Sequence, residues 1–594
     1  MCSRIKSCIA MNNFKHLMMG SLLLAGCAHA PKHAEVIPLN PAAVSEQVSD
    51  RAVEPVAEVE PLLPDVELSS ELLYELLLTE FASQRGHQAL AVEGSTDIAR
   101  KTRDPRLAKR AAQLAMESGD ITKTIEAFRF WQEVEPKTVM TPRVLSSLLL
   151  RGGRLDEAGV EFAKVIKSTE PEVGPSFLQI YPLFASYPGK TAVLKLAKEL
   201  ARPYPHVAEA HWMVAQLAQA AGDDALALTE VRTARSIKPD WDFPVSLEAQ
   251  LLRKTDPAQS LSVLAAYLLK NPKSADLRLQ YARALLEQKQ YQPARIEFQT
   301  LADGSPDSVD LAFAVALISL QLNDVAGAEA QLRKALGKRG QGQDGVAYFL
   351  GQLSEAKEDE DEALVHYRGV SGGEYQFPAQ LRVVYLLSKK GQRAEARLYL
   401  QKMQAATDPQ RLQLVLIEAQ LLRDAKQNKE AYKVLQQGLL KMPGQTELLY
   451  EGAMLADMLG HHETAEQMLR KVIKLKPDHA HAYNALGYSL LERNVRIPEA
   501  VRLVEKALQL APDDIAIMDS VGWGYFRSGR LDESVKMLRR AYAGNPDPEI
   551  ALHLGEALWA MGSKEEAAKL WQDSLKTNPG NQPLQAVIKR YQLQ

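Results

Sequence analysis

Residues 513–546 carry small and large apolar side chains at helical spacing, in two stripes that a turn at Gly529 separates. Residues three and four positions apart share one face of a helix, so each stripe predicts a helix, and Pro546 predicts the end of the second one. The small residues in both stripes predict that the two helices approach each other closely. The stripes consist of Met518, Val521, Gly522 and Tyr525, and of Ser534, Leu538 and Ala541.

Such a helix pair cannot bury its apolar faces alone, and the chain repeats it. Prolines that close the pairs form two series, in each of which they lie 33 to 35 residues apart. A helix–turn–helix period of about 34 residues with this order of positions resembles the tetratricopeptide repeat. The resemblance implies an all-α superhelical solenoid over residues 69–580, with room for about 15 helix–turn–helix units. The prolines are Pro239, Pro272 and Pro306, and Pro443, Pro477, Pro512, Pro546 and Pro579.

Glycine content predicts where this array is interrupted. Residues 337–343 read GKRGQGQ, and the wide conformational range of glycine makes such a stretch a joint. We therefore expect an N-terminal block of repeats at 69–336 and a C-terminal block at 344–580. The remaining residues, 581–594, are expected to form a capping helix.

The first 26 residues predict an export signal rather than a folded element. Basic residues precede an apolar run at 17–25, which is far shorter than the ~20 residues of a membrane-spanning helix. The run ends in Leu-Ala-Gly-Cys at 24–27, which resembles the lipobox of bacterial lipoproteins. The resemblance implies that the signal is removed before Cys27 and that Cys27 is lipidated. A complete signal also begins at Met11, so Met1 and Met11 both remain as translation starts.

The residues that follow Cys27 predict which membrane retains the protein and how its folded part is attached. The next residue is Ala28 and not aspartate, and the lipoprotein resemblance then implies the outer membrane, with the folded part facing the periplasm. Residues 27–68 are rich in proline, alanine and glutamate and contain no aromatic residue. They predict a lipidated end followed by a disordered tether, which holds the folded part away from the lipid surface.

Length, charge and cysteine content exclude several other classes. A chain of 594 residues is too long for one compact core, and its formal charge of −3 with no basic cluster argues against nucleic-acid binding. The three cysteines, Cys2, Cys8 and Cys27, all lie in the first 27 residues. The folded part therefore has no disulfide, no thiolate metal site and no catalytic cysteine.

Motifs for catalysis or metal binding are incomplete in this sequence. His462-Glu463 begins like a zinc-protease motif, but Glu466 stands where the second histidine is required. The neighbouring histidines at 461, 479 and 481 fall at a turn and a helix start, and we interpret them as solvated residues. We therefore predict a non-enzymatic protein without cofactor, metal or small-molecule substrate.

A stripe beside the packing stripe on each first helix predicts a protein-binding groove. In the last four complete units this stripe is rich in aromatic side chains with interspersed acids, and such side chains can anchor a peptide or a helix. The alternative, that some of them belong to the core between repeats, remains open. The candidate groove residues are Tyr450, Met454, Tyr488, Asp519, Trp523, Phe526 and Trp559.

The start of the array extends the resemblance through two stretches, ELLYELLLTEFASQRG at 71–86 and TRDPRLAKRAAQLA at 102–115. They are similar to the outer-membrane tetratricopeptide lipoproteins that partner a periplasmic carboxy-terminal processing protease. The resemblance implies an adaptor that recruits or activates the protease and presents cell-wall hydrolases to it. The alternative is an assembly factor for an envelope machine, in pilus, exopolysaccharide or outer-membrane biogenesis.

Overall fold

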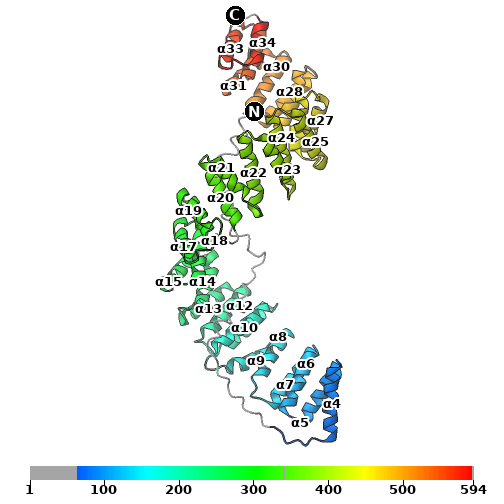
Figure 1. Cartoon of the computed structure of the whole chain (residues 1–594), viewed down its shortest axis with the longest axis vertical. Coiled ribbons are helices and arrows are strands. Elements are labelled where there is room, and N and C mark those ends of the chain that lie inside the picture. The colour runs from blue at the N-terminus through cyan, green and yellow to red at the C-terminus, as the bar shows by residue number, and fades with distance from the viewer. Residues whose placement is uncertain (1–62, 339–341, 592–594) are drawn as a thin grey trace. The chain divides into compact units, whose positions relative to one another are not determined.

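The computed structural model describes residues 63–338 and 342–591. The predicted signal at 1–26, the lipidation site Cys27 and most of the predicted tether lie outside these residues, as do residues 339–341 of the predicted joint. Every regular element within the described ranges is an α-helix, so the prediction of an all-α chain is confirmed. The helices are numbered α4 to α34, and Figure 1 labels most of them.

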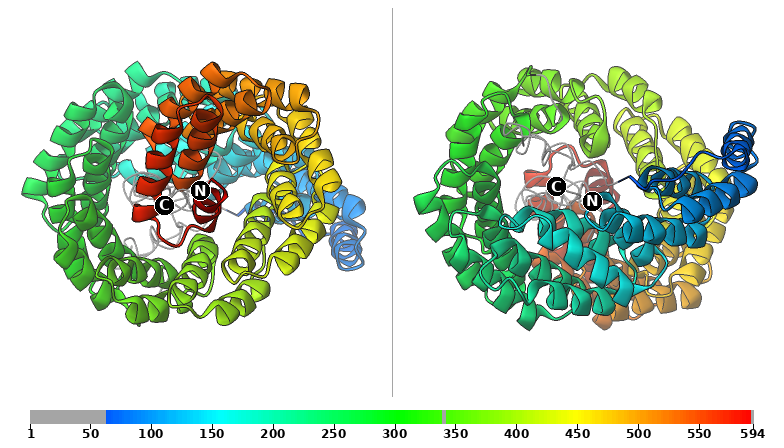
Figure 2. Two further views of the ribbon diagram at one scale, coloured as in Figure 1. Left: turned by 90° about the horizontal axis from the view of Figure 1, so that it is seen from above. Right: turned by 90° about the horizontal axis from the view of Figure 1, so that it is seen from below.

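The chain divides into two compact units between Gln343 and Asp344. In each unit, successive helices pack against one another and form a curved double row (Figure 2). The helices of the first unit are α4 (Ser70–Gln84), α5 (Gln88–Thr102), α6 (Pro105–Glu117), α7 (Ile121–Val134), α8 (Met140–Arg151), α9 (Leu155–Lys167), α10 (Gly174–Ser186), α11 (Lys190–Ala201), α12 (Ala208–Ala220), α13 (Asp224–Ile237), α14 (Asp242–Thr255), α15 (Pro257–Lys270), α16 (Ala275–Glu287), α17 (Tyr291–Gly304), α18 (Val309–Gln321) and α19 (Val325–Ala335).

The second unit begins with α20, whose first residue lies at the boundary. Its helices are α20 (Gln343–Ala356), α21 (Glu360–Arg368), α22 (Gly373–Lys389), α23 (Arg393–Lys402), α24 (Asp408–Asp424), α25 (Asn428–Lys441), α26 (Thr446–Met458), α27 (His462–Leu475), α28 (Ala480–Glu492), α29 (Ile497–Leu510), α30 (Ile515–Arg527), α31 (Leu531–Gly544), α32 (Pro548–Ala560), α33 (Lys564–Thr577) and α34 (Gln582–Arg590).

The helices fall into consecutive pairs that correspond to the repeat in the sequence. Within the described residues, the thirty helices from α4 to α33 form fifteen pairs, in agreement with the expected number. First helices of neighbouring pairs also contact each other, as α28 contacts α30 and α30 contacts α32, so they form the inner row of the second unit. The last helix, α34, packs on α32 and α33.

The pair α30–α31 shows how the local sequence produces the repeat. Helix α30 begins where the side chain of Asp514 accepts hydrogen bonds from the backbone N–H groups of Ala516 and Ile517, a stable N-terminal cap. The turn after α30 contains Gly529, whose φ of 82° lies in the left-handed region that glycine adopts without strain. The chain can therefore reverse direction at once and lay α31 against α30.

The two predicted packing stripes meet between α30 and α31. A Cβ atom on Gly522 would lie only 2.5 Å from the Cγ atom of Leu538, so the position has room for glycine alone. This geometry confirms the predicted close approach of the two helices, while Tyr525 is only partly buried. The fully buried members of the stripes are Met518, Val521, Gly522, Ser534, Leu538 and Ala541.

Candidate protein-binding surface

The inner helices α26, α28, α30 and α32 carry all seven groove residues that the sequence predicts. Two of them are buried, since Asp519 is 6% and Trp523 is 8% exposed. The other five are partly buried. Asp519 and Trp523 therefore belong to the core between repeats, which was the alternative to a groove position. The role of the seven residues in binding a partner stays a prediction.

Trp523 is held from three sides. Its indole N–H donates a hydrogen bond of 2.8 Å to the carboxylate of Glu492 on α28. Its ring stacks on Phe526, with 4.9 Å between the ring centroids, and on His553 of α32, with 4.3 Å between them. Parallel rings at these separations attract each other, so Trp523 links three consecutive inner helices.

The buried partner of Trp523, His553, is itself bonded to Asp519. The Nδ1 atom of His553 lies 3.0 Å and 3.1 Å from the two carboxylate oxygens of Asp519. Burial alone would lower the pKa of His553, but the hydrogen bond to Asp519 and the charges of Asp519, Glu549 and Glu492 together raise it above its ordinary value. Asp519 is thus the partner of an internal histidine.

Tyr488 extends this arrangement across α30. Its hydroxyl group donates a hydrogen bond of 2.7 Å to the carboxylate of Glu549 on α32. Burial, followed by the charge of Glu549, raises the pKa of Tyr488, so the phenol stays neutral and remains a donor. The structure therefore brings Tyr488, Asp519, Trp523 and Phe526 together at one place on the inner row.

The remaining predicted residues lie at other places on the inner row. Tyr450 on α26 packs against the same apolar cluster as Tyr488, and burial raises its pKa to about 12. Met454 lies one turn further along α26. Trp559 belongs to a separate cluster, in which its ring lies 4.4 Å from that of Tyr591 and 5.9 Å from that of Trp571, measured between centroids.

Sequence reasoning missed His553, Glu492 and Glu549. None of them stands in the predicted groove stripe, and each meets its partner in a different repeat. The signal available in the sequence was the spacing of 34 residues, one repeat, between Asp519 and His553. Spacing alone does not distinguish His553 from the histidines at 461, 462, 479 and 481.

Asp457 contacts both Ser489 and His462, but the three residues do not lie in the order of a catalytic triad. Asp457 accepts hydrogen bonds from Ser489 and from the Nδ1 atom of His462, both at 2.8 Å. The carboxylate lies between the serine and the histidine, whereas activation of a serine requires the histidine to lie between the other two. The described residues contain no group of three or more histidine, cysteine, aspartate or glutamate side chains placed to bind a metal ion. None of the helices from α4 to α34 combines the length and the apolar composition that a membrane-spanning segment needs.

Comparisons with known proteins agree with this architecture. The tetratricopeptide-repeat family models match residues 251–318, 450–515 and 522–583. The TPR repeat-containing protein PA4667 of Pseudomonas aeruginosa is 34% identical over 550 residues, which cover 92% of this chain and 91% of that protein. The chain belongs to the tetratricopeptide-repeat proteins. Repeats of this family generally bind protein partners, and the fold typically carries no catalytic site.

Other similarities are shorter or more distant. A TPR repeat-containing protein of Dictyostelium discoideum is 28% identical over 111 residues, which are 18% of this chain and 42% of that protein. Among solved structures, MamA from Desulfovibrio magneticus is 21% identical and matches 30% of this chain and 99% of its own, with a TM-score of 0.26. The APC/C hetero-tetramer Cut9–Hcn1 is 14% identical and matches 77% and 96%, also with a TM-score of 0.26.

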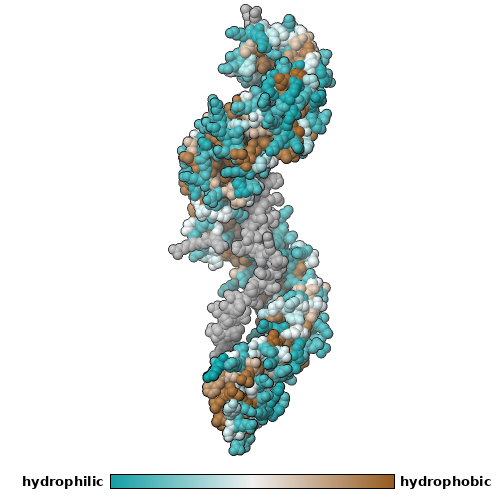
Figure 3. All heavy atoms as spheres, turned by 90° about the vertical axis from the view of Figure 1, so that its right-hand side faces the viewer, coloured by the Kyte–Doolittle hydropathy of each residue, from teal (hydrophilic) through white to brown (hydrophobic). Residues whose placement is uncertain are grey.

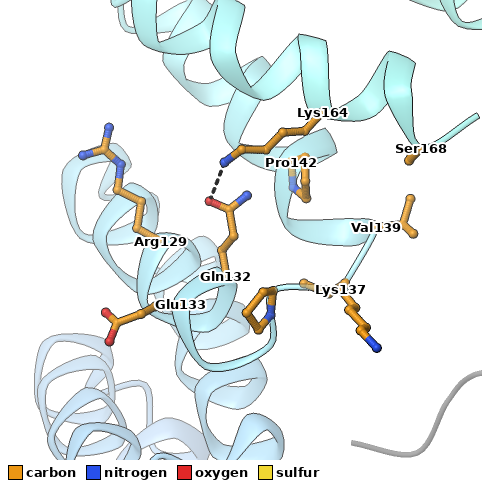
Figure 4. Close-up of a pocket in the computed structure, with 10 residues that line it drawn as sticks. Arg129, Gln132, Glu133, Lys137, Val139, Pro142, Lys164 and Ser168 are labelled. Carbon is orange, nitrogen blue, oxygen red and sulfur yellow. Dashed lines mark hydrogen bonds between the residues drawn. The ribbon is translucent and has the colours of Figure 1, made fainter.

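The first unit of the tetratricopeptide array contains an open hollow of about 490 Å³ between α7, α8 and α9 (Figure 4). Lys164 donates a hydrogen bond of 3.2 Å to Gln132 across it. Two of the basic groups on its rim have acidic partners, since Arg129 pairs with Glu157 and Lys164 with Glu161. The hollow therefore offers no uncompensated charge to a ligand at these two positions.

The first helix of the tetratricopeptide array, α4, exposes an apolar face. A hydrophobic area lies at the lower end of the molecule in Figure 3, over this part of the chain. The exposed fractions range from 43% for Leu78 to 66% for Tyr74. In a repeat array each pair stacks on its neighbours, and the first pair has no preceding described helix. The exposed residues are Leu73, Tyr74, Leu77, Leu78 and Phe81.

Proposed function

We propose that this protein is a lipid-anchored, non-enzymatic scaffold of the outer membrane that faces the periplasm and binds proteins along its inner helices. Its partners would be a carboxy-terminal processing protease, which it recruits or activates, and cell-wall hydrolases, which it presents to the protease. The anchor is Cys27, on the basis of the Leu-Ala-Gly-Cys sequence and the short apolar run before it.

The observation that carries the proposal is the succession of helix pairs in both units. From Ser70 to Thr577 the described residues are occupied by pairs of one kind, which leaves no separate domain there for catalysis. A long inner row offers room for two proteins at once. Two partners bound to one scaffold meet at a high effective concentration, so proteolysis is promoted without any chemistry by the scaffold itself.

The experiment that tests the proposal combines capture with reconstitution. The tagged full-length protein is crosslinked in cells, purified from detergent-solubilised envelopes and examined by mass spectrometry. We expect a carboxy-terminal processing protease together with cell-wall hydrolases. The purified protease should then degrade a captured hydrolase faster when the scaffold is added.

Two results would contradict the proposal. Recovery of secretin or polysaccharide-export subunits without a peptidase would favour the assembly-factor alternative. Capture of the protease with no change in its rate of proteolysis would exclude an activating role. A scaffold lacking residues 1–26 and carrying Cys27→Ser serves as the soluble control in the reconstitution, because the inner row is the same in both forms.

A further inference from the structure

Three side-chain hydrogen bonds join the inner helices α28, α30 and α32 in a closed triangle. Glu492 of α28 accepts a bond from Trp523 of α30, Asp519 of α30 is bonded to His553 of α32, and Glu549 of α32 accepts a bond from Tyr488 of α28. Each side of the triangle connects a different pair of helices. The position of each helix is therefore fixed by the other two.

One side of this triangle contains an ionisable group, the imidazole of His553. Histidine is the side chain that normally titrates between about pH 5 and 8. His553 is 4% exposed, and its ring lies against the face of Trp523. When the ring is protonated it forms an ion pair with Asp519 and a cation–π contact with Trp523, and both are stronger away from water.

The groups that face His553 are mostly acidic. They are Asp519 from α30, Tyr488 and Glu492 from α28, and Glu549 from one turn earlier on α32. The guanidinium group of Arg527 lies on the Trp523 ring, 5.6 Å from its centroid. An imidazolium ion at His553 therefore compensates buried negative charge, and removal of its proton leaves the Asp519 carboxylate buried beside a neutral ring.

We propose that His553 and Asp519 form a proton-operated latch that holds the inner row of the second unit together when His553 is protonated and loosens it when the proton is lost. The latch closes α30 onto α32 directly and tightens the whole triangle through Trp523. At pH values above the pKa of His553, the neutral imidazole still donates a hydrogen bond to Asp519, but the ion pair and the cation–π contact are lost.

The direction of the effect follows from linkage. The pKa of His553 is raised in the folded protein, so the latch contributes its full stabilisation below the unfolded pKa of about 6.5 and loses it as the pH rises through the folded value. One consequence rests on the proposed function. A partner that binds at Trp523 and Phe526 contacts a rigid surface of α28, α30 and α32 at acidic pH and a more flexible one at alkaline pH.

The test needs no partner, so its failure is distinguishable from a failure of the proposed function. Deuterium exchange at the C2 atom of histidine rings is followed by mass spectrometry across the pH range in the full-length protein in detergent. His206, which is exposed in the first unit, serves as the internal reference. We expect His553 to titrate at a higher pH than His206, and Asp519→Asn to shift the His553 titration downward.

Urea unfolding of the wild type and of His553→Gln then measures the latch itself. The wild type should be the more stable protein at acidic pH. This difference in stability should decrease toward alkaline pH. For each pKa unit by which deuterium exchange places folded His553 above the unfolded value, the ratio of the two unfolding equilibrium constants should change by a factor of about ten. The matched variant His206→Gln should keep the wild-type pH profile.

Two outcomes would overturn the latch. One is a His553 titration at or below that of His206. The other is a stability difference between the wild type and His553→Gln that does not change with pH. If His553→Gln fails to fold, the Asp519→Asn titration decides, because an unchanged His553 titration in that variant shows that the pair does not share a proton-dependent interaction.

Discussion

The hydroxyl group of Ser534 on α31 donates a hydrogen bond of 2.7 Å to the carbonyl oxygen of Gly522 on α30. In the first unit, Ser260 on α15 makes the corresponding bond of 2.8 Å to the carbonyl oxygen of Ala249 on α14. A small residue on the first helix brings the second helix close enough for its side chain to reach the backbone. The bond therefore belongs to the packing of the repeat and recurs where that packing is tight.

The close approach at Gly522 predicts a sensitive position. We expect Gly522→Ala to destabilise the second unit by about 1–3 kcal/mol, because the added Cβ atom overlaps the side chain of Leu538. The measurement is urea unfolding followed by far-UV circular dichroism. The helical signal of the folded protein should stay near that of the wild type.

A second buried glycine of an inner helix provides the control. A Cβ atom on Gly452 would lie 3.5 Å from the sulfur of Met468, which is an ordinary contact. Gly452→Ala should be neutral or stabilising by up to about 1 kcal/mol, because alanine favours a helix more than glycine does. An equal loss of stability in both variants would show that the contact with Leu538 is not the cause.

Trp523 is expected to contribute to stability more than an open groove residue would. Trp523→Ala should cost about 3–5 kcal/mol in urea unfolding, because it empties a buried site. Trp523→Phe keeps an aromatic ring but removes the donor to Glu492, and should cost less. A negligible loss in Trp523→Ala would mean that the ring is not held as described. Capture of a partner by Trp523→Ala is informative only alongside this measurement.

We expect Glu466 on α27 to make the free energy of unfolding depend on pH in the acidic range. Its hydrogen bonds with Arg496 and Arg470 hold its pKa below the usual range. Because the pKa of Glu466 is lower in the folded protein, its ionised side chain stabilises the fold at pH values above the unfolded pKa of about 4.3. This stabilisation is lost as the pH falls through the folded pKa. Glu466→Gln should therefore cost up to about 1 kcal/mol at pH 7 and nothing at low pH.

The control for Glu466 lies on the same helix. Glu463 is exposed near the start of α27, so Glu463→Gln should leave the pH dependence of unfolding unchanged. Chemical denaturation at a series of pH values compares both variants with the wild type. A constant difference between the wild type and Glu466→Gln at all pH values would contradict the assignment.

The lipid anchor has its own test in cells. Cys27→Ser should move the protein from the membrane fraction to the soluble fraction, because the residue can no longer be acylated. Cys8→Ser is the matched control and should leave the protein in the membrane fraction. The fractions are compared by immunoblotting after separation of inner and outer membranes. Membrane retention of Cys27→Ser would exclude the anchor.

The repeat was predictable from the sequence because the residues that pack within each helix pair recur at fixed intervals. Gly522, Ser534 and Leu538 recur in equivalent form along the chain, and each acts within its own helix pair. The triangle on the inner row was not predictable, because its bonds span 31, 34 and 61 residues and depend on how neighbouring pairs are rotated. The same rotation buries Trp523, which would be exposed on an isolated helix pair.

The bond between Tyr488 and Glu549 links repeats that are not adjacent, since the pair α30–α31 lies between them. A solenoid normally behaves as a one-dimensional chain of elements that interact with nearest neighbours only, and such a chain can fray one element at a time. A bond between second neighbours raises the cost of opening the middle element alone. The three repeats from α28 to α33 should therefore melt as one cooperative block, a segment of fixed length inside an otherwise gradually fraying array.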